Sequence, residues 1–183
     1  MDNEQDLMEK TLSSTVHYDG VVCRFVVDDI ELPNGNRSTR EYVHHRGGAA
    51  ILAVDEEGYT YVVRQFRHPY GEVITEIPAG KLEQGEEPIV TAERELEEEI
   101  GRKADRIVPF GMLYPSPGYT DEHLYIYLAT GLHRVNAHLD EDEFLHVLRL
   151  PFAQLLQQVL SGEIHDAKTC YAVLRYAGEV GVK

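Results

Sequence analysis

The stretch GKLEQGEEPIVTAERELEEEIG, residues 80–101, decides the fold and the chemistry predicted for this chain. If its second half forms a helix, Glu95, Glu98 and Glu99 lie at positions i, i+3 and i+4 and share one face. Apolar side chains occupy a neighbouring face, about 110° away at roughly 100° per residue. They belong to Ile89, Ala92, Leu96 and Ile100. One side of the helix can therefore lie in a core while three carboxylates converge beside it.

Three like charges at this spacing repel one another unless a cation lies among them. Carboxylate oxygens are hard ligands, and without sulfur or clustered imidazole they suit Mg²⁺ or Mn²⁺. Taken alone, the run ELEEE is more simply explained as a solvated, Glu-rich helix face than as a cation site. Pro88 suits a helix start, and Gly101 stands where a helix C-terminus commonly needs a left-handed residue. The stretch therefore predicts a divalent-cation site on a helix that begins near Pro88.

The wider spacing of the polar residues is more specific than the Glu-rich run. Five residues separate the first member of the pattern from the second, and seven separate the second from the third. The members are Gly80, Glu86, Arg94, Glu95, Glu98, Glu99 and Gly101. This pattern resembles the Nudix box, the signature of the Nudix hydrolase superfamily. The box ends in an aliphatic residue where this chain has Arg102, a departure expected to affect helix-end packing more than chemistry.

Composition and charge narrow the class of protein. The chain has 183 residues and is 43% hydrophobic, as expected for a globular domain with a substantial core. Its net charge of −15 argues against duplex nucleic acid as a partner, because phosphate binding needs a basic footprint. The acidic start MDNEQDLMEK does not resemble a signal peptide, and no apolar run reaches the roughly 18 residues of a membrane span. The two cysteines lack metal-type spacing, so we expect a cytoplasmic protein with reduced thiols.

Along the chain, β-type runs surround one central helix. The turn signal at 32–36 predicts an antiparallel ribbon over 15–45. Further strands are expected at 49–54, 59–66, 106–113, 123–129 and 144–150, with closing helices at 152–160 and 167–179. This order predicts an α/β/α sandwich around a mixed sheet, which is also the layered plan that the box implies. We expect residues 1–46 to form an N-terminal arm and dimerising ribbon, and residues 47–183 to form the Nudix domain.

Residues 15–180 as a whole resemble the ADP-ribose pyrophosphatase branch, which hydrolyses nucleoside diphosphate sugars. The segments that carry the resemblance are ELPNGNRSTRE, VVRQFRHP, EIPAGKLEQGE, SPGYTDE, DEDEF and DAKTCYA. The branch also has a proline sixteen residues after the last box glycine, where this chain has Pro117. A proline in a turn is ordinary, so the ordered segments carry more weight than this single residue.

The resemblance implies roles for the box residues. Glu95 and Glu99 would bind Mg²⁺, with Glu98 close to the metal cluster and the backbone carbonyl of Ala79 as a further ligand. Such an all-oxygen set suits a metal that also binds phosphate and water. Arg94 would pair with a second box residue, Glu86, and orient the loop and the helix, although a surface salt bridge is the plain alternative.

The remaining catalytic group would be a glutamate on a loop well after the box. The only downstream acidic cluster of this kind is Asp140-Glu141-Asp142-Glu143. Within it, Glu143 is the best match for the general base and a further metal contact, and Glu141 is the second candidate for the base. A solvated acidic loop explains the same residues almost equally well. The cluster does not fit a calcium loop, because glycine is absent from its sixth position.

Substrate contacts are assigned by the resemblance to residues outside the helix. Arg64 and Arg67 point to opposite faces of one strand, and the match favours Arg67 as the residue that reaches the diphosphate. Arg40 would contact the nucleotide, from its own subunit or from a partner. Pro117 and Glu122 would lie beside the substrate, and the sequence does not indicate which aromatic ring stacks on the base.

We therefore expect a Mg²⁺-dependent enzyme, with Mn²⁺ as the alternative metal, that cleaves the diphosphate of ADP-ribose or a related nucleotide sugar. The branch forms homodimers through the N-terminal ribbon, so a homodimer is expected. Two alternatives stay open. One is a hydrolase of nucleoside triphosphates or dinucleoside polyphosphates. The other is a catalytically silent ADP-ribose-binding module, although such modules usually lose box carboxylates that this chain retains.

Overall fold

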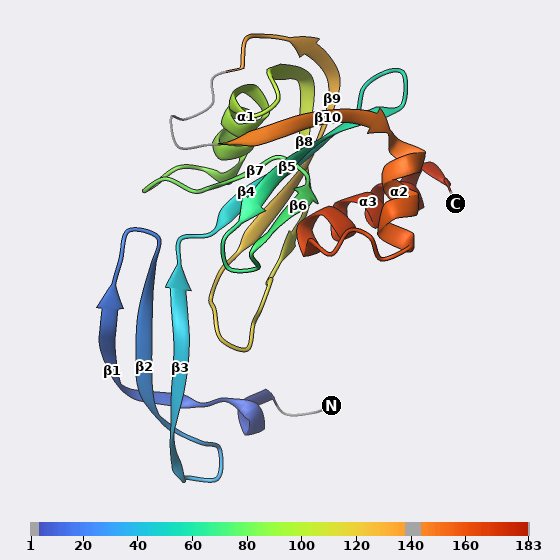
Figure 1. Ribbon diagram of the computed structural model, residues 1–183. Helices are drawn as coiled ribbons and strands as arrows, with labels where there is room; N and C mark the ends of the chain where they lie inside the picture. Colours follow the sequence, from blue (N-terminus) through green and yellow to red (C-terminus); the bar gives the residue numbers. More distant parts are fainter. Residues whose placement is uncertain (1–3, 138–143, 183) are drawn as a thin grey trace. The chain divides into compact units, whose positions relative to one another are not determined.

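A computed structural model describes residues 4–137 and 144–182 and divides the chain into two compact units. The first unit comprises residues 1–46 and 116–122, and the second comprises residues 47–115 and 123–183. The elements labelled in Figure 1, with the short 3-10 helix η1 before them, are η1 (Glu4–Leu7), β1 (Lys10–Asp19), β2 (Cys23–Glu31), β3 (Arg37–His45), β4 (Gly48–Ala53), β5 (Tyr59–Arg67), β6 (Glu72–Glu76), β7 (Ala79–Lys81), α1 (Pro88–Glu98), β8 (Arg102–Leu113), β9 (Leu124–Arg134), β10 (Leu145–Pro151), α2 (Phe152–Leu160) and α3 (Ala167–Val180). None of the helices in the described ranges has the length and apolar character needed to cross a membrane.

The first unit is an antiparallel sheet in the order β1-β2-β3. The ribbon predicted over residues 15–45 starts earlier, because β1 pairs with β2 from Lys10 opposite Glu31 onward. The turn between β2 and β3 is closed by a 2.8 Å hydrogen bond from the Leu32 N–H to the Asn36 carbonyl. The loop 116–122 joins the same unit, since the Val43 N–H donates to the Tyr119 carbonyl at 2.8 Å.

The second unit contains a three-stranded sheet, β10-β5-β6, and a four-stranded sheet, β7-β4-β9-β8. β4 and β9 run parallel, whereas the other pairs in these two sheets are antiparallel. The prediction of a mixed α/β architecture is therefore confirmed. The closing helices also match their predicted ranges, and β8 and β9 are longer than predicted.

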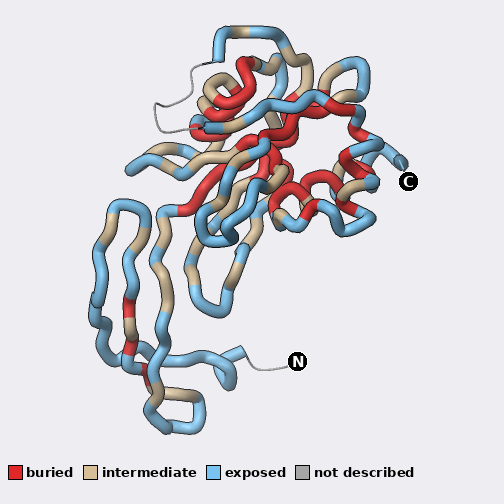
Figure 2. Tube along the Cα trace, in the orientation of Figure 1, coloured by how far each residue is buried: buried red, intermediate tan, exposed pale blue. Residues whose placement is uncertain are grey.

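Strand β4 forms the centre of the core because both of its faces are covered. All six of its residues are buried (Figure 2). Ala49, Ile51 and Ala53 face the cluster that contains α1, whereas Ala50 and Leu52 face the cluster built with α2 and α3. The alternation of side chains along a strand thus divides one apolar run between two layers. This division produces the α/β/α sandwich.

Helix α1 begins and ends as its sequence predicts. Pro88 occupies its first turn, where the missing N–H costs nothing. Gly101 follows the helix with φ of +61°, in the left-handed region, and its N–H donates to the Glu97 carbonyl at 3.0 Å. The buried residues of the helix include Ala92 and Leu96 on one side and Glu95 on another. The helix therefore presents an acidic face that is itself largely removed from solvent.

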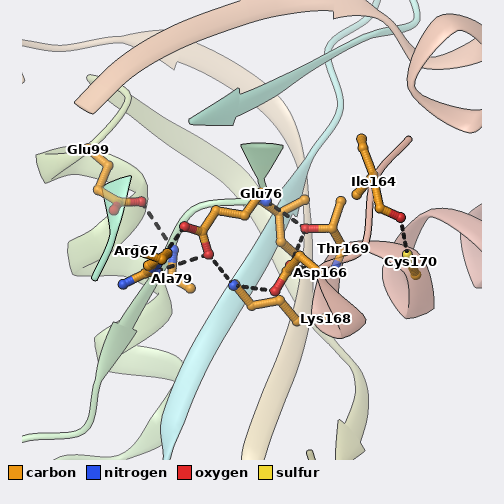
Figure 3. A network of polar contacts seen from close by, with 10 residues as sticks. Arg67, Glu76, Ala79, Glu99, Ile164, Asp166, Lys168, Thr169 and Cys170 are labelled. Atoms are coloured by element: carbon orange, nitrogen blue, oxygen red, sulfur yellow. Dashed lines mark hydrogen bonds and ion pairs between the residues drawn. The ribbon is translucent and has the colours of Figure 1, made fainter. Parts of the chain in front are cut away.

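A buried ionic network attaches α3 to the end of β6 (Figure 3). Glu76 is 1% exposed and accepts two hydrogen bonds from Arg67, at 2.8 and 2.9 Å. Its carboxylate also forms an ion pair with Lys168, whose ammonium donates to Asp166 at 2.9 Å. Asp166 in turn caps α3 by accepting from the Thr169 N–H at 3.0 Å. The opposite charges of Glu76 and Lys168 thus compensate each other in a buried region where water does not solvate them.

Replacing Lys168 with methionine should strongly destabilise the protein. The substitution leaves the buried Glu76 with one cationic partner, and breaking a buried pair from one side typically costs about 3–5 kcal/mol. Urea unfolding of Lys168→Met measures the loss. The matched control is Lys103→Met, which removes an exposed ion pair with Glu97 and should cost less than about 1 kcal/mol. Equal losses in the two variants would contradict the role given to the network.

Candidate active site

Of the five residues predicted to bind metal, Glu95 and Glu98 lie on α1, Glu99 directly follows it, and Ala79 begins β7. Glu95 and Glu99 are buried, with 5% and 3% of their surface exposed, and Glu98 is partly exposed. The Glu99 carboxylate accepts a 3.1 Å hydrogen bond from the Ala79 N–H. This contact holds the C-terminal turn of α1 against the first residue of β7 across 20 positions of sequence.

Gly80 allows the Glu95 carboxylate to lie directly against the backbone of β7. A Cβ atom built on Gly80 would lie only 1.6 Å from Oε1 of Glu95 and 2.2 Å from its Cδ. Any other residue at this position would collide with the buried carboxylate. The glycine at the start of the box is therefore required by this close approach rather than by a left-handed φ angle.

The cation among the box carboxylates in this structure is the guanidinium of Arg94. Its Nη1 lies 2.7 Å from the Glu95 carboxylate and 2.9 Å from the Glu98 carboxylate. Its Nε lies 3.4 Å from Glu86, so the predicted pair is present. Burial opposes the charge, but hydrogen bonds to Glu86 and Glu98 outweigh it and raise the pKa of Arg94. One arginine therefore contacts three glutamates, offsets one of their three negative charges and itself stays charged.

Glu86 connects the loop before the helix to the helix itself. Its carboxylate accepts hydrogen bonds from the Glu83 N–H at 3.0 Å and from the Thr91 hydroxyl at 2.8 Å. Burial alone would raise its pKa, but these two bonds and the contact with Arg94 together lower it. Glu86 is therefore an ionised anchor that fixes the approach of the loop to α1.

The donor atoms around Gly80 fit a hard divalent cation in their chemistry. Glu95 and Glu99 bring carboxylate oxygens to the backbone of Ala79 and Gly80, and Mg²⁺ prefers such oxygens. Across residues 4–137 and 144–182, however, no three His, Cys, Asp or Glu side chains converge on one point as a metal-binding group. The reason is visible in the contacts, since Glu95 and Glu98 are directed to Arg94 while Glu99 is directed to the Ala79 N–H.

Arg67 lies close enough to this cluster to be influenced by its charge. Its guanidinium is held by Glu76, and its side chain is 38% exposed. Burial opposes the charge, but the Glu76 carboxylate and the more distant charges of Asp166 and Glu99 raise its pKa. Figure 3 shows Arg67, Ala79 and Glu99 in the same region. Arg67 thus presents a fixed, permanently charged group beside the buried glutamates, whereas Arg64 on the same strand is exposed.

Three predicted substrate contacts belong to the first compact unit. Arg40, on β3, forms an ion pair with Glu9 in which Nε donates to Oε2 at 2.9 Å. Glu122 lies 3.4 Å from Nδ1 of His45, and Pro117 is exposed in the loop 116–122. In this unit the end of β3 and the loop are fastened together, since the His45 N–H also donates to Asp121 at 2.9 Å. The predicted general base Glu143 and its reserve Glu141 lie outside the described residues.

The buried ionic network that holds Arg67 was not predicted from the sequence. Glu76 and Lys168 stand in EIPAGKLEQGE and DAKTCYA, two segments that carry the family resemblance. Their residue types alone do not reveal that both are buried, because most acids and lysines are exposed. Only the fold shows that Glu76 holds Arg67 in place and is itself paired with Lys168.

Comparison with known proteins agrees with this geometry. The NUDIX domain model matches residues 44–171. An ADP-ribose pyrophosphatase of Bacillus subtilis (strain 168) is 46% identical, with 92% of each chain covered. A methanol dehydrogenase activator of Bacillus methanolicus is 44% identical, with 90% of each chain covered. The chain therefore belongs to the NUDIX family, as its box and its carboxylate cluster predict.

The fold is also that of a solved structure. A crystal structure described as an ADP compounds hydrolase superimposes with a TM-score of 0.81, covering 97% of this chain and 98% of that chain. At 21% identity this likeness supports the architecture alone. The predicted Nudix fold is thus confirmed.

The lowered pKa of Glu86 predicts that the stability of the fold depends on pH. Its pKa is lower in the folded chain than the ordinary value of 4.5. The ionised carboxylate therefore stabilises the fold above about pH 4.5, and this contribution is lost as the pH falls through the lowered pKa. Glu86→Gln should lower the free energy of unfolding by about 1–3 kcal/mol at neutral pH and by less near pH 3.5.

Urea unfolding at both pH values measures this difference. Glu93→Gln, at an exposed position on α1, is the control and should show no comparable loss at either pH. A loss for Glu86→Gln that is as large in acid as at neutral pH would show that its charge is not the stabilising feature.

Proposed function

We propose that this chain hydrolyses the diphosphate bond of ADP-ribose or a related nucleoside diphosphate sugar, releasing a nucleoside monophosphate and a sugar phosphate. The observation that carries the proposal is the pair of buried carboxylates, Glu95 and Glu99, against the backbone of Ala79 and Gly80. Buried acids of this kind need cationic compensation, and a metal-bound diphosphate requires such oxygens. The relative named ADP-ribose pyrophosphatase supports the choice of substrate.

The cofactor would be Mg²⁺, with Mn²⁺ as the alternative. Glu95, Glu98, Glu99 and the carbonyl of Ala79 would hold it. When bound, such a cation withdraws charge from a diphosphate and lowers the pKa of a water ligand. Glu95 and Glu98 would then exchange their contact with Arg94 for the metal. Arg94 would keep its contact with Glu86 and hold the loop and helix in register.

Substrate binding would use residues outside the box. Arg67, fixed by Glu76, would pair with the diphosphate, because a guanidinium matches phosphate oxygens in geometry and charge. Arg40, Pro117 and Glu122 would contact the nucleotide, with Arg40 released from Glu9. Glu143 would act as general base.

A homodimer formed through the N-terminal sheet is part of the proposal. β1 is exposed along its whole length, including Val16 and Tyr18 at 52% and 64%, and exposed apolar side chains favour association. Sedimentation velocity should show a dimer at micromolar concentration. A monomer under those conditions would refute this part.

A substrate panel tests the function directly. ADP-ribose, GDP-mannose, dGTP and a dinucleoside polyphosphate are each incubated with Mg²⁺, with Mn²⁺ and with EDTA. We expect turnover of nucleoside diphosphate sugars that EDTA abolishes. Preferred turnover of dGTP or the dinucleoside polyphosphate would support the first alternative. Binding of ADP-ribose without release of phosphate-bearing products would support a silent binding module.

The close approach at Gly80 gives a sharper test of the same site. Gly80→Ala forces the Glu95 carboxylate away from β7 and should lower kcat by about 100-fold, since a displacement of about 1 Å near the reacting atoms can cost that much. Gly178→Ala is the matched control, because a Cβ at Gly178 meets no atom within 4 Å. An unchanged kcat in Gly80→Ala would contradict the placement of Glu95 in the site.

A further inference from the structure

The first turn of α3 lies in a motif to which the proposed function gives no role. This motif is DAKTCYA, residues 166–172, one of the segments that carry the family resemblance. Asp166 is the N-cap of α3, and the helix begins directly after it. Lys168 and Thr169 are buried, at 8% and 0% exposure. A lysine is almost never buried unless it is paired, so the contacts of this turn indicate what it does.

Asp166 fixes the directions of both buried side chains. Its Oδ2 accepts hydrogen bonds from the Thr169 N–H at 3.0 Å and from the Thr169 hydroxyl at 2.5 Å. Its Oδ1 accepts from the Lys168 ammonium at 2.9 Å. A carboxylate is the favoured cap at the positive end of the helix dipole. One side chain therefore caps α3 and also directs Lys168 and Thr169 towards β6.

Lys168 and Thr169 contact two consecutive residues at the end of β6, each 92 positions earlier in the chain. The Lys168 ammonium forms an ion pair with the Glu76 carboxylate. The Thr169 hydroxyl oxygen accepts a 2.9 Å hydrogen bond from the Ile77 N–H. Glu76 and Ile77 are 1% and 0% exposed, and a buried backbone N–H needs an acceptor. The first turn of α3 thus holds both the side chain of Glu76 and the backbone beside it.

Glu76 transmits this fixed position to Arg67 (Figure 3). Nε of Arg67 donates to Oε1 of Glu76 at 2.8 Å, and Nη2 donates to Oε2 at 2.9 Å. Two parallel bonds of this kind define the plane of a guanidinium as well as its place. A guanidinium has five N–H donors, so three lie outside these two bonds. The orientation of these three donors therefore depends on the orientation of the Glu76 carboxylate.

The charges of the network balance, so its effect on a ligand is one of orientation. The four charged side chains alternate in sign, in the order Arg67, Glu76, Lys168 and Asp166. The Arg67 side chain is 38% exposed, whereas the other three are 1%, 10% and 13% exposed. Arg67 is therefore the end of the network that meets a ligand, and α3 is the end that fixes it to the fold.

We propose that the first turn of α3 is a positioning element for the substrate, in which Lys168 and Thr169 orient Arg67 through Glu76 to hold the diphosphate. The choice of ligand rests on the proposed function, whereas the contacts that hold Arg67 do not. A guanidinium binds phosphate oxygens through directed pairs of hydrogen bonds. Holding the side chain in advance avoids the entropy loss of ordering it when the substrate binds.

Steady-state kinetics with ADP-ribose and Mg²⁺ test the proposal. Lys168→Met should raise KM by at least about tenfold and leave kcat within about twofold, because a contact made equally before and during the reaction affects KM alone. In the Arg67→Leu background the same substitution should change KM by less than about twofold, since its effect passes through Arg67. Thr169→Val should also raise KM, and Thr169→Ser, which keeps the hydroxyl, should restore the wild-type value.

Leu155→Ala is the matched control for loss of stability. Leu155 is fully buried on α2 and lies outside the network, so its truncation destabilises the core and should leave KM unchanged. Circular dichroism verifies that each variant is folded under the assay conditions. An unchanged KM in Lys168→Met, or an equal rise in Leu155→Ala, would overturn the proposal.

The side-chain Nε–H signal of Arg67 in proton–nitrogen NMR spectra gives a second readout that needs no substrate. The signal is identified by its loss in Arg67→Leu. Its exchange with water should be faster in Lys168→Met than in the wild type and in Leu155→Ala. Equal exchange in all three proteins would overturn the proposal even if the wild type hydrolyses no ADP-ribose. The expected exchange pattern in a wild type that hydrolyses none would contradict the proposed function and still support the orientation of Arg67 by α3.

Discussion

The contacts of Arg94 with three glutamates are the interaction on which the rest of the site depends. Glu86, Glu95 and Glu98 come from the loop before α1 and from two turns of the helix, and a single guanidinium reaches all of them. Without that positive charge, two carboxylates on one helix face and a third beside them would repel one another in a partly buried space. Arg94 therefore allows an acidic helix face to pack against β7.

The same arrangement explains how the site could accept a metal without refolding. Glu95 and Glu99 are already fixed by the close approach to Gly80 and by the Ala79 N–H. A metal would replace part of the charge compensation that Arg94 provides. The buried pair of Glu76 and Lys168 extends the support to Arg67, so that one ionic network holds this arginine and another holds the glutamates.

Much of this could be predicted from sequence because the signals are periodic or locally defined. The apolar face of α1, the proline at its start and the glycine after its end follow from spacing alone. The closing helices and the strand pairs around the turns were predicted for the same reason. The family follows from the length and specificity of the box, which the NUDIX match confirms.

What could not be predicted depends on contacts between distant segments. The sequence placed three carboxylates on one face but did not show that Arg94 would lie among them. Burial of Glu76 and Lys168 depends on α3 packing against β6, 92 residues apart in the chain. Arg102 stands opposite Arg134 because of the register of β8 and β9, which the residue types do not fix. Local spacing thus predicts elements, and tertiary packing decides which charges meet.

Anomalous diffraction from crystals soaked in Mn²⁺ measures whether the box glutamates hold a divalent cation against the backbone of β7. An anomalous peak is expected about 2.0–2.3 Å from carboxylate oxygens of Glu95 and Glu99 and from the Ala79 carbonyl, between the distances usual for Mg²⁺ and Ca²⁺. No peak at these residues at saturating Mn²⁺, with Arg94 still in contact with Glu95 and Glu98, would contradict this expectation.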